Sequence, residues 1–180
     1  YMNAVRAVIN FGLTEFDLRE AQNPFLNLPI RDDAPAAVDE RKPFPEELLP
    51  ATRQRLENHA SGDLWQIWRI VENTGCRLGE VTGLLVADLN LEAETPHINL
   101  VPHPHRRLKT AGSTRRVPLV GAALEAAKEA REAAGDNALL FPRYGRLRGA
   151  DAASAILMKH IREVTSDKKI VVHSLRHRME

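Results

Sequence analysis

Two histidines and an arginine near the end of the sequence have the spacing of an anion-binding cluster. His173, Arg176 and His177 stand at i, i+3 and i+4, so a helix would place them on one face. Ser174 is predicted to cap this helix, which Leu175 to Glu180 would continue. The start of a helix also offers unpaired N–H groups and the positive end of its dipole. Together these features favour the binding of an anionic group such as a phosphate.

Two earlier stretches could complete the same site. The first covers residues 74–81 (TGCRLGEV), where Arg77 begins a predicted helix and Glu80 is within reach of its guanidinium. The second covers residues 107–119 and contains Lys109 next to a predicted turn. Each stretch also has a simpler interpretation. Arg77 and Glu80 could be an exposed ion pair worth about 0.5 kcal/mol, and Lys109 could be a solvated loop lysine.

The charge distribution says more about possible partners than the net charge, which is +1 over 180 residues. Residues 103–119 contain no acid and five basic side chains, namely Arg106, Arg107, Lys109, Arg115 and Arg116. The sequence from Arg143 onward is again rich in Arg and Lys, whereas residues 15–57 hold many of the acids. Basic patches on a nearly neutral chain indicate a surface for a polyanion. Ordinary solvated surface charge is the alternative.

Several classes of protein are disfavoured by composition. A single cysteine, Cys76, excludes an internal disulfide and suits a reducing compartment, so we expect a cytoplasmic protein. No apolar run approaches membrane-spanning length, and no secretory signal is visible. His97, His103 and His105 could suggest a metal site, but no Cys or carboxylate completes a ligand set there. We therefore expect no metal and no other cofactor.

The periodicity of apolar residues predicts the elements that position these groups. Helices are predicted over residues 1–18, 48–59, 63–73 (capped by Asp63), 77–85, 120–134 and 150–164. Residues 97–101 alternate like a strand, and residues 106–109 are predicted to pair with 115–119 as a hairpin. Trp65 and Trp68 are interpreted as core. The predicted fold class is α+β, mainly α-helical with a small antiparallel β-sheet.

Proline and glycine positions divide the chain into three parts. Residues 1–27 hold one helix, residues 28–43 form a proline-rich linker, and residues 44–180 form the main domain. Packing of the N-terminal helix on the main core is the alternative. The chain begins at Tyr1, and its last predicted helix barely starts before Glu180. We therefore expect it to be a piece of a longer protein.

Taken in order, these motifs resemble the tyrosine recombinase (phage integrase) family. In that family an Arg opens a helix in a T-G-x-R-x-x-E pattern, a Lys lies on a β-hairpin turn, and an H-x-L-R-H helix start follows. The resemblance covers roughly residues 44–180 and the N-terminal helix with Asn23-Pro24-Phe25. It implies the catalytic-domain fold of these DNA breaking–rejoining enzymes. Residues 1–27 would then be the last helix of an upstream core-binding domain.

The resemblance also implies a role for each site residue. A tyrosine hydroxyl would attack a DNA phosphodiester, leaving a 3′-phosphotyrosyl bond and a free 5′-hydroxyl. Arg77 and Arg176 would hold the non-bridging oxygens, with Glu80 supporting Arg77. Lys109 would protonate the leaving 5′-oxygen. His173 would assist proton removal or bond the phosphate, and His177 would support Arg176.

The family's tyrosine nucleophile lies downstream of the H-x-L-R-H helix. Tyr1 and Tyr144 are the two tyrosines of this chain, and neither stands in that place. We therefore expect this chain alone to be unable to form the covalent intermediate.

Double-stranded DNA and other recombinase protomers, in a tetramer on DNA, are the expected partners. Contacts to backbone phosphates are predicted for seven arginines, namely Arg106, Arg107, Arg115, Arg116, Arg143, Arg146 and Arg148. The main alternative function is a non-catalytic DNA-binding protein derived from a recombinase. A type IB topoisomerase, whose active site is similar, is a more distant alternative.

Overall fold

The computed structural model describes residues 2–18, 20–26, 42–106 and 113–179. The chain divides into two compact units, Tyr1–Val38 and Asp39–Glu180, and each is described by itself. In the parts of the chain that the structure describes, no helix combines the length and apolar character needed to cross a membrane.

The described part of the first unit consists of helix α1 (Met2–Glu15) and the segment that returns along it. Asn23 is buried and holds this segment in place. Its Nδ2 donates to Oδ1 of Asn10 at 2.6 Å, and its Oδ1 accepts from the backbone N–H of Phe25 at 3.0 Å. Among the described residues, α1 buries none of its side chains, and Phe11 is largely exposed. The helix predicted at the N-terminus is confirmed.

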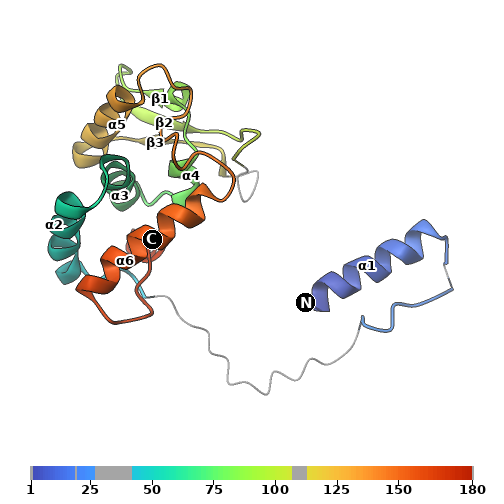
Figure 1. Cartoon of the computed structure of the whole chain (residues 1–180). Helices are drawn as coiled ribbons and strands as arrows, with labels where there is room; N and C mark the ends of the chain where they lie inside the picture. Colours follow the sequence, from blue (N-terminus) through green and yellow to red (C-terminus); the bar gives the residue numbers. More distant parts are fainter. Residues whose placement is uncertain (1, 19, 27–41, 107–112, 180) are drawn as a thin grey trace. The chain divides into compact units, whose positions relative to one another are not determined.

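The second unit is built around a central helix, α3. Its helices are α2 (Leu49–His59), α3 (Gly62–Thr74), α4 (Leu78–Thr82), α5 (Gly121–Ala134), α6 (Gly149–Val164) and α7 (Ser174–His177), with short 3-10 turns η1 (Glu46–Leu48) and η2 (Val86–Asp88). Helix α3 packs against α2, α4 and α5 (Figure 1). It also contacts α7. Trp68 on α3 is fully buried and meets the edge of Phe44 with ring centroids 5.7 Å apart. The interpretation of Trp68 as core is confirmed.

A small antiparallel sheet packs beside these helices. Its strands, in the order β1-β2-β3, are β1 (Leu89–Asn90), β2 (His97–Leu100) and β3 (Arg115–Pro118). Ile98 lies opposite Val117, and Leu100 lies opposite Arg115. Because side chains alternate between the two faces, Arg115 shares the face of the buried Ile98, Leu100 and Val117. The predicted class, mainly helical with a small antiparallel sheet, is confirmed.

Strand β3 pairs with β2, a partner that the sequence-based prediction does not include. Strand β2 offers an apolar face on which Val117 can be buried. The backbone of Arg106, the first residue of the predicted hairpin, forms an isolated bridge with His103. Residues 107–109 lie outside the described residues, so their pairing with residues 115–119 stays a prediction.

Two predicted helix caps are wrong. The hydroxyl of Ser174 accepts a hydrogen bond from the backbone N–H of Val171 at 3.1 Å, and His173 occupies the N-cap of α7. Asp63 lies inside the first turn of α3, where its carboxylate accepts from the N–H of Leu64, and Ser61 occupies the N-cap. Helix α7 has only four residues, so its dipole adds little to the site, and its side chains must bind any anion.

The packing of α5 on α3 makes a prediction about stability. The inner face of α5 consists of alanines, and Ala127 is fully buried. Ala127→Leu forces extra methylenes into this close contact, so we expect a loss of about 1–3 kcal/mol in the free energy of unfolding. Urea denaturation measures this loss. Ala133→Leu, at an exposed position of the same helix, should change it by less than about 0.5 kcal/mol. Equal losses in both variants would contradict this packing.

Candidate active site

The turn between α3 and α4 places Arg77 at the start of α4. Thr74 donates its hydroxyl to the Ile70 carbonyl at 2.6 Å and accepts from the N–H of Cys76 at 3.3 Å. Gly75 follows at φ +63°, a left-handed conformation that glycine adopts without strain and that ends α3. The chain then turns sharply, and Arg77 becomes the N-cap of α4 in an extended conformation.

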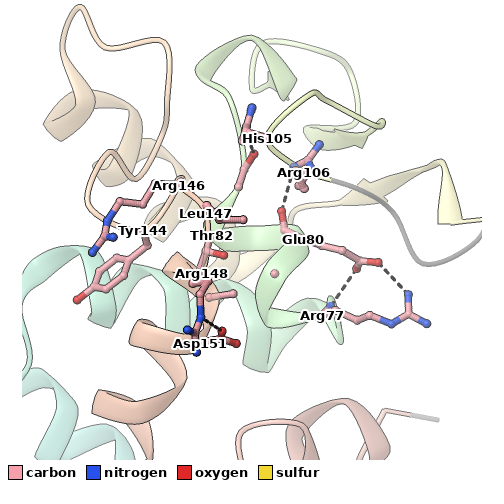
Figure 2. A pocket seen from close by; sticks show the side chains of 14 residues that line it. Arg77, Glu80, Thr82, His105, Arg106, Tyr144, Arg146, Leu147, Arg148 and Asp151 are labelled. Atoms are coloured by element: carbon pink, nitrogen blue, oxygen red, sulfur yellow. Dashed lines mark hydrogen bonds and ion pairs between the residues drawn. The ribbon is translucent and has the colours of Figure 1, made fainter. Parts of the chain in front are cut away.

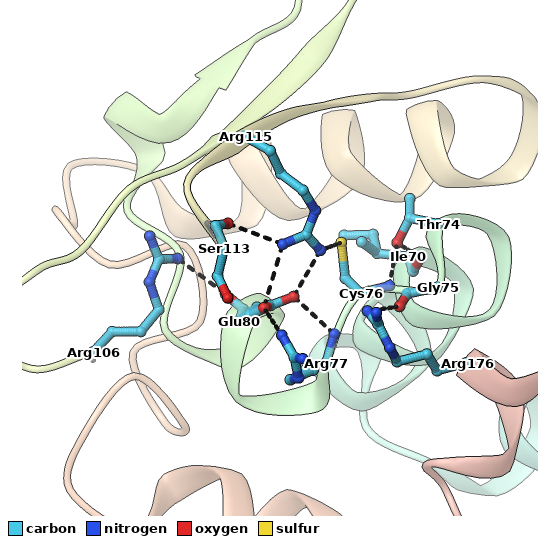
Figure 3. A network of polar contacts seen from close by, with 10 residues as sticks. All are labelled: Ile70, Thr74, Gly75, Cys76, Arg77, Glu80, Arg106, Ser113, Arg115 and Arg176. Carbon is cyan, nitrogen blue, oxygen red and sulfur yellow. Dashed lines mark hydrogen bonds and ion pairs between the residues drawn. The ribbon is translucent and has the colours of Figure 1, made fainter. Parts of the chain in front are cut away.

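The carboxylate of Glu80 binds both the backbone and the side chain of Arg77. One carboxylate oxygen accepts from the Arg77 backbone N–H at 2.9 Å, and the other accepts from its Nη1 at 2.9 Å. The guanidinium of Arg115 binds the same carboxylate, with Nη2 2.9 Å from Oε2 (Figure 3). The Glu80 side chain is only 5% exposed, whereas Arg77 and Arg115 are each 32% exposed. A buried carboxylate is thus bridged by two half-exposed guanidiniums.

The pKa of Glu80 shows that this bridge dominates its environment. Burial by itself raises the pKa of the carboxyl group, because it disfavours the charged form. Hydrogen bonds from Arg115 and then from Arg77 outweigh burial, and the resulting pKa lies below the ordinary value. Glu80 is therefore ionised in the folded protein at neutral pH.

Helix α7 docks on the same turn. Nη1 of Arg176 donates to the carbonyl of Gly75 at 3.0 Å, two residues before Arg77 (Figure 3). The rings of His173 and His177 meet edge to face with centroids 4.9 Å apart. A small cavity of about 110 Å³ lies beside this contact, and Cys76, His173 and Arg176 are among the residues that line it. The structure thus brings both predicted arginines and both histidines to one place.

A larger depression of about 520 Å³ extends from Arg77 and Glu80 towards the segment before α6 (Figure 2). Arg146 and Arg148 line its far part and are exposed. Tyr144 lies across the depression from Arg77 and is 2% exposed. Burial raises the pKa of Tyr144, with the negative charge of Asp63 adding to this effect, so its hydroxyl stays protonated.

The arginines predicted to contact phosphates lie in different environments. Arg143, Arg146 and Arg148 are exposed before α6, and Arg116 is exposed on β3. Arg106 is buried, and the partly exposed Arg115 binds Glu80. Lys109 and Arg107 lie outside the described residues, so the placement of these two stays a prediction.

Arg106 is the clearest difference from the sequence-based prediction. It is 4% exposed; its Nη1 donates to the Glu80 carbonyl at 2.9 Å, and its Nη2 donates to the Asp88 carboxylate at 3.2 Å and to the Val101 carbonyl at 2.6 Å. Burial lowers the pKa of Arg106, and Asp88 partly offsets that effect. A guanidinium bound in this way supports α4 from behind and offers no surface to DNA.

Asp88 is a structural residue that the sequence-based prediction missed. Its carboxylate accepts hydrogen bonds from Arg106 and from the backbone N–H of Leu85, the latter at 3.0 Å. It also lies 2.8 Å from Nε2 of His103. His105 is similarly occupied, because its Nε2 lies 3.0 Å from the Gly83 carbonyl. Within the described ranges, no group of three or more His, Cys, Asp or Glu residues is arranged to hold a metal ion.

The lowered pKa of Glu80 predicts how stability depends on pH. Because the folded-state pKa lies below the ordinary value of 4.5, the ionised carboxylate stabilises the folded state above that pH. This contribution is lost as the pH falls through the lower folded-state pKa. We expect Glu80→Gln to reduce the free energy of unfolding by about 1.5–3 kcal/mol at pH 7. The difference from the unsubstituted protein should shrink towards pH 3.

Urea denaturation at a series of pH values measures this difference. Glu132→Gln, at an exposed position of α5, is the matched control and should follow the unsubstituted protein throughout. A destabilisation by Glu80→Gln that stays constant from neutral to acid pH would show that the charge of Glu80 is not what stabilises the fold.

The chain is similar to known proteins in sequence and in fold. The model of the phage integrase family matches residues 43–179. The crystal structure of XerA recombinase is similar with a TM-score of 0.56 and 18% identity, over 76% of this chain and 48% of that one. The Tn1549 transposon integrase, in complex with transposon right end DNA, is similar with a TM-score of 0.62 and 18% identity, over 98% and 62%. No functionally curated protein matches the chain.

The two solved structures show the fold, and they confirm the predicted tyrosine recombinase catalytic-domain architecture. The chain spans about half of one and three fifths of the other. The family match covers most of the chain and includes the turn with Arg77, the strand with Arg115 and the whole of α7. The chain therefore belongs to the phage integrase, or tyrosine recombinase, family.

Proposed function

We propose that this chain is the catalytic domain of a site-specific DNA recombinase, which cleaves and rejoins strands through a 3′-phosphotyrosyl intermediate. The observation that carries this proposal is the hydrogen bond from Arg176 to the carbonyl of Gly75, 101 residues earlier in the chain. It places the guanidinium-bearing helix α7 beside Arg77. Family membership supports the reaction, and the similar Tn1549 integrase, which is bound to transposon DNA, supports the substrate.

The two arginines suit the charge that develops during strand cleavage. Attack on a phosphodiester concentrates negative charge on the non-bridging oxygens of the phosphate. A guanidinium stays charged at any working pH and can donate two parallel hydrogen bonds to such oxygens. Arg77, which is 32% exposed with Glu80 on one side, binds these oxygens together with Arg176.

The remaining groups move protons. Lys109 donates a proton to the leaving 5′-oxygen, which is otherwise a poor leaving group. His173 assists the removal of the proton from the attacking hydroxyl or bonds the phosphate. His177, whose ring meets that of His173, supports Arg176. Because the positive charge comes from side chains, this scheme needs no metal.

The attacking tyrosine is not one of the two in this chain. Tyr144 is buried, and Tyr1 lies outside the described residues. We propose that this chain alone does not form the covalent intermediate. By the same family resemblance, we propose that the protein acts in the cytoplasm as a tetramer on DNA.

Strand joining tests this function without requiring a tyrosine. A library of nicked duplexes with randomised flanks carries a 3′-(4-nitrophenyl) phosphate beside a 5′-hydroxyl. Attack of the 5′-oxygen on phosphorus forms the phosphodiester and releases 4-nitrophenolate, while the proton passes to a base. We expect the protein to join a subset of these sequences. Arg77→Ala and Arg176→Ala should each slow joining about 10²- to 10³-fold, because each removes a donor to the charged phosphate.

Absorbance of nitrophenolate gives the rate, and sequencing of the joined strands identifies the preferred site. Arg131→Ala, at an exposed position of α5, is the arginine control and should join at the original rate. Duplex affinity should be largely kept in all variants, since many phosphate contacts share it. Binding without any joining would sink the enzymatic proposal and favour the non-catalytic DNA-binding alternative.

The exposed arginines before α6 make a prediction about salt dependence. Arg146 and Arg148 line the far part of the depression that begins at Arg77, so a DNA backbone that lies along it passes both. Neutralising one phosphate contact lowers the slope of log affinity against log salt by about 0.9. The double variant Arg146→Gln/Arg148→Gln should therefore lower this slope by about 1.8 in a fluorescence titration. Arg131→Gln should leave the slope unchanged, and an unchanged slope in the double variant would place the DNA elsewhere.

A further inference from the structure

Arg115 binds the carboxylate of Glu80, the residue that also holds Arg77. It does so from strand β3, which carries none of the predicted catalytic residues. Its Nη2 lies 2.9 Å from Oε2 of Glu80, and its Nη1 lies 3.0 Å from the Ser113 carbonyl and 3.4 Å from Oε1 of Glu80. Nη2 is also 3.8 Å from Sγ of the buried Cys76. Figure 3 shows the guanidinium aimed at the Glu80 carboxylate, with Arg77 on the other side of that carboxylate.

The register of the sheet explains why the Arg115 side chain points towards Glu80. Arg115 stands two residues before Val117, which is buried opposite Ile98, so both side chains leave β3 on the same face. Arg116 leaves on the opposite face and is exposed. A basic side chain on the buried face of a sheet needs a partner for its charge, and Glu80 supplies that partner.

Arg115 also changes the electrostatic balance around Arg77. A buried carboxylate paired with Arg77 alone would cancel its charge and compete with a phosphate for the same guanidinium. With Arg115 included, the three ionised groups carry a net charge of +1. Among the interactions that lower the pKa of Glu80, the hydrogen bond from Arg115 is the largest, and both Nη1 and Nη2 of Arg115 donate to the carboxylate.

The backbone of Glu80 is held by a contact that does not involve its carboxylate, because Nη1 of Arg106 donates to the Glu80 carbonyl at 2.9 Å. The carboxylate accepts from the Arg77 backbone N–H at 2.9 Å on one side. Arg115 donates to the same carboxylate from the side opposite to Arg77 and so helps to set its rotamer.

We propose that Arg115 is a positioning residue for strand transfer: by binding Glu80 from β3, it orients the Arg77 guanidinium towards the substrate phosphate. This role rests on the proposed recombinase function. Arg115 itself does not contact the phosphate, in contrast to its sequence-based prediction as a DNA-backbone contact. Its loss therefore acts on the rate of the chemical step and spares duplex binding.

The strand-joining reaction of the whole chain tests this role through four proteins: unsubstituted, Arg115→Met, Arg77→Ala and the double variant. Methionine keeps much of the apolar stem of the arginine and removes its charge. We expect Arg115→Met to slow joining about 10- to 100-fold. The affinity for the same duplex and its salt slope should stay unchanged.

The double variant separates positioning from a general structural effect. If Arg115 acts through Arg77, adding Arg115→Met to Arg77→Ala should slow joining no further, because the group to be oriented is already gone. If Arg115 only stabilises the fold, the two losses should multiply. Multiplying losses, or a joining rate unchanged by Arg115→Met, would overturn the proposal.

Two further variants keep the test decisive. Arg131→Met, at an exposed position of α5, should join at the unsubstituted rate. Arg115→Lys retains the positive charge but has one donor nitrogen, so it should fold even where Arg115→Met does not. We expect it to join strands at a rate between those of the unsubstituted protein and Arg115→Met. A lysine variant as slow as Arg115→Met, or as fast as the unsubstituted protein, would contradict the orienting role. Absence of joining by the unsubstituted protein would overturn the proposed function, and this role with it.

Discussion

The buried carboxylate of Glu80 is the interaction on which the site depends. It lies between Arg77 on α4 and Arg115 on β3, and the carbonyl of the same residue accepts from Arg106. Removing such a group from water is unfavourable unless charged donors satisfy it, and here two guanidiniums do so. One residue thus fixes the sheet, the short helix α4 and the orientation of the candidate catalytic arginine relative to one another.

The second requirement is that the two arginine-bearing segments meet although they are far apart in sequence. Gly75 makes this possible, because its left-handed conformation ends α3 and turns its carbonyl to Arg176. A side chain at Gly75 would be strained at this φ and would contact Met179, just after α7. The T-G pair before Arg77 therefore has a structural reason: Thr74 closes the end of α3, and Gly75 receives α7.

Local sequence was a good guide where apolar periodicity or a compact motif determines the structure. The long helices follow their apolar stripes, and Glu80 stands one turn from Arg77, as the spacing predicts. The pairing of β3 with β2 is not predicted from the sequence, because proximity along the chain favours residues 106–109 as the partner, whereas burial of Val117 favours β2. Ser174 does not cap α7 as predicted, because its hydroxyl instead accepts a hydrogen bond from the backbone N–H of Val171.

The arginines show where sequence alone reaches its limit. Arg106, Arg115 and Arg116 belong to one basic stretch, and composition treats them alike. The structure gives each a different environment: Arg106 is buried against Asp88, Arg115 faces Glu80, and Arg116 faces solvent. The alternation with Val117 could have separated Arg115 from Arg116, because a strand points neighbouring side chains in opposite directions. No local pattern predicts the burial of Arg106, which depends on residues brought together by the fold.

A crystal structure of the protein bound to a nicked DNA duplex would show whether Arg77 and Arg176 bind the same phosphate. We expect their guanidiniums both to lie about 2.7–3.2 Å from non-bridging oxygens of one phosphate. Glu80 should remain between Arg77 and Arg115 in that complex. A DNA backbone that meets only one of the two arginines, or that passes the α3–α4 turn without contacting either, would contradict the account.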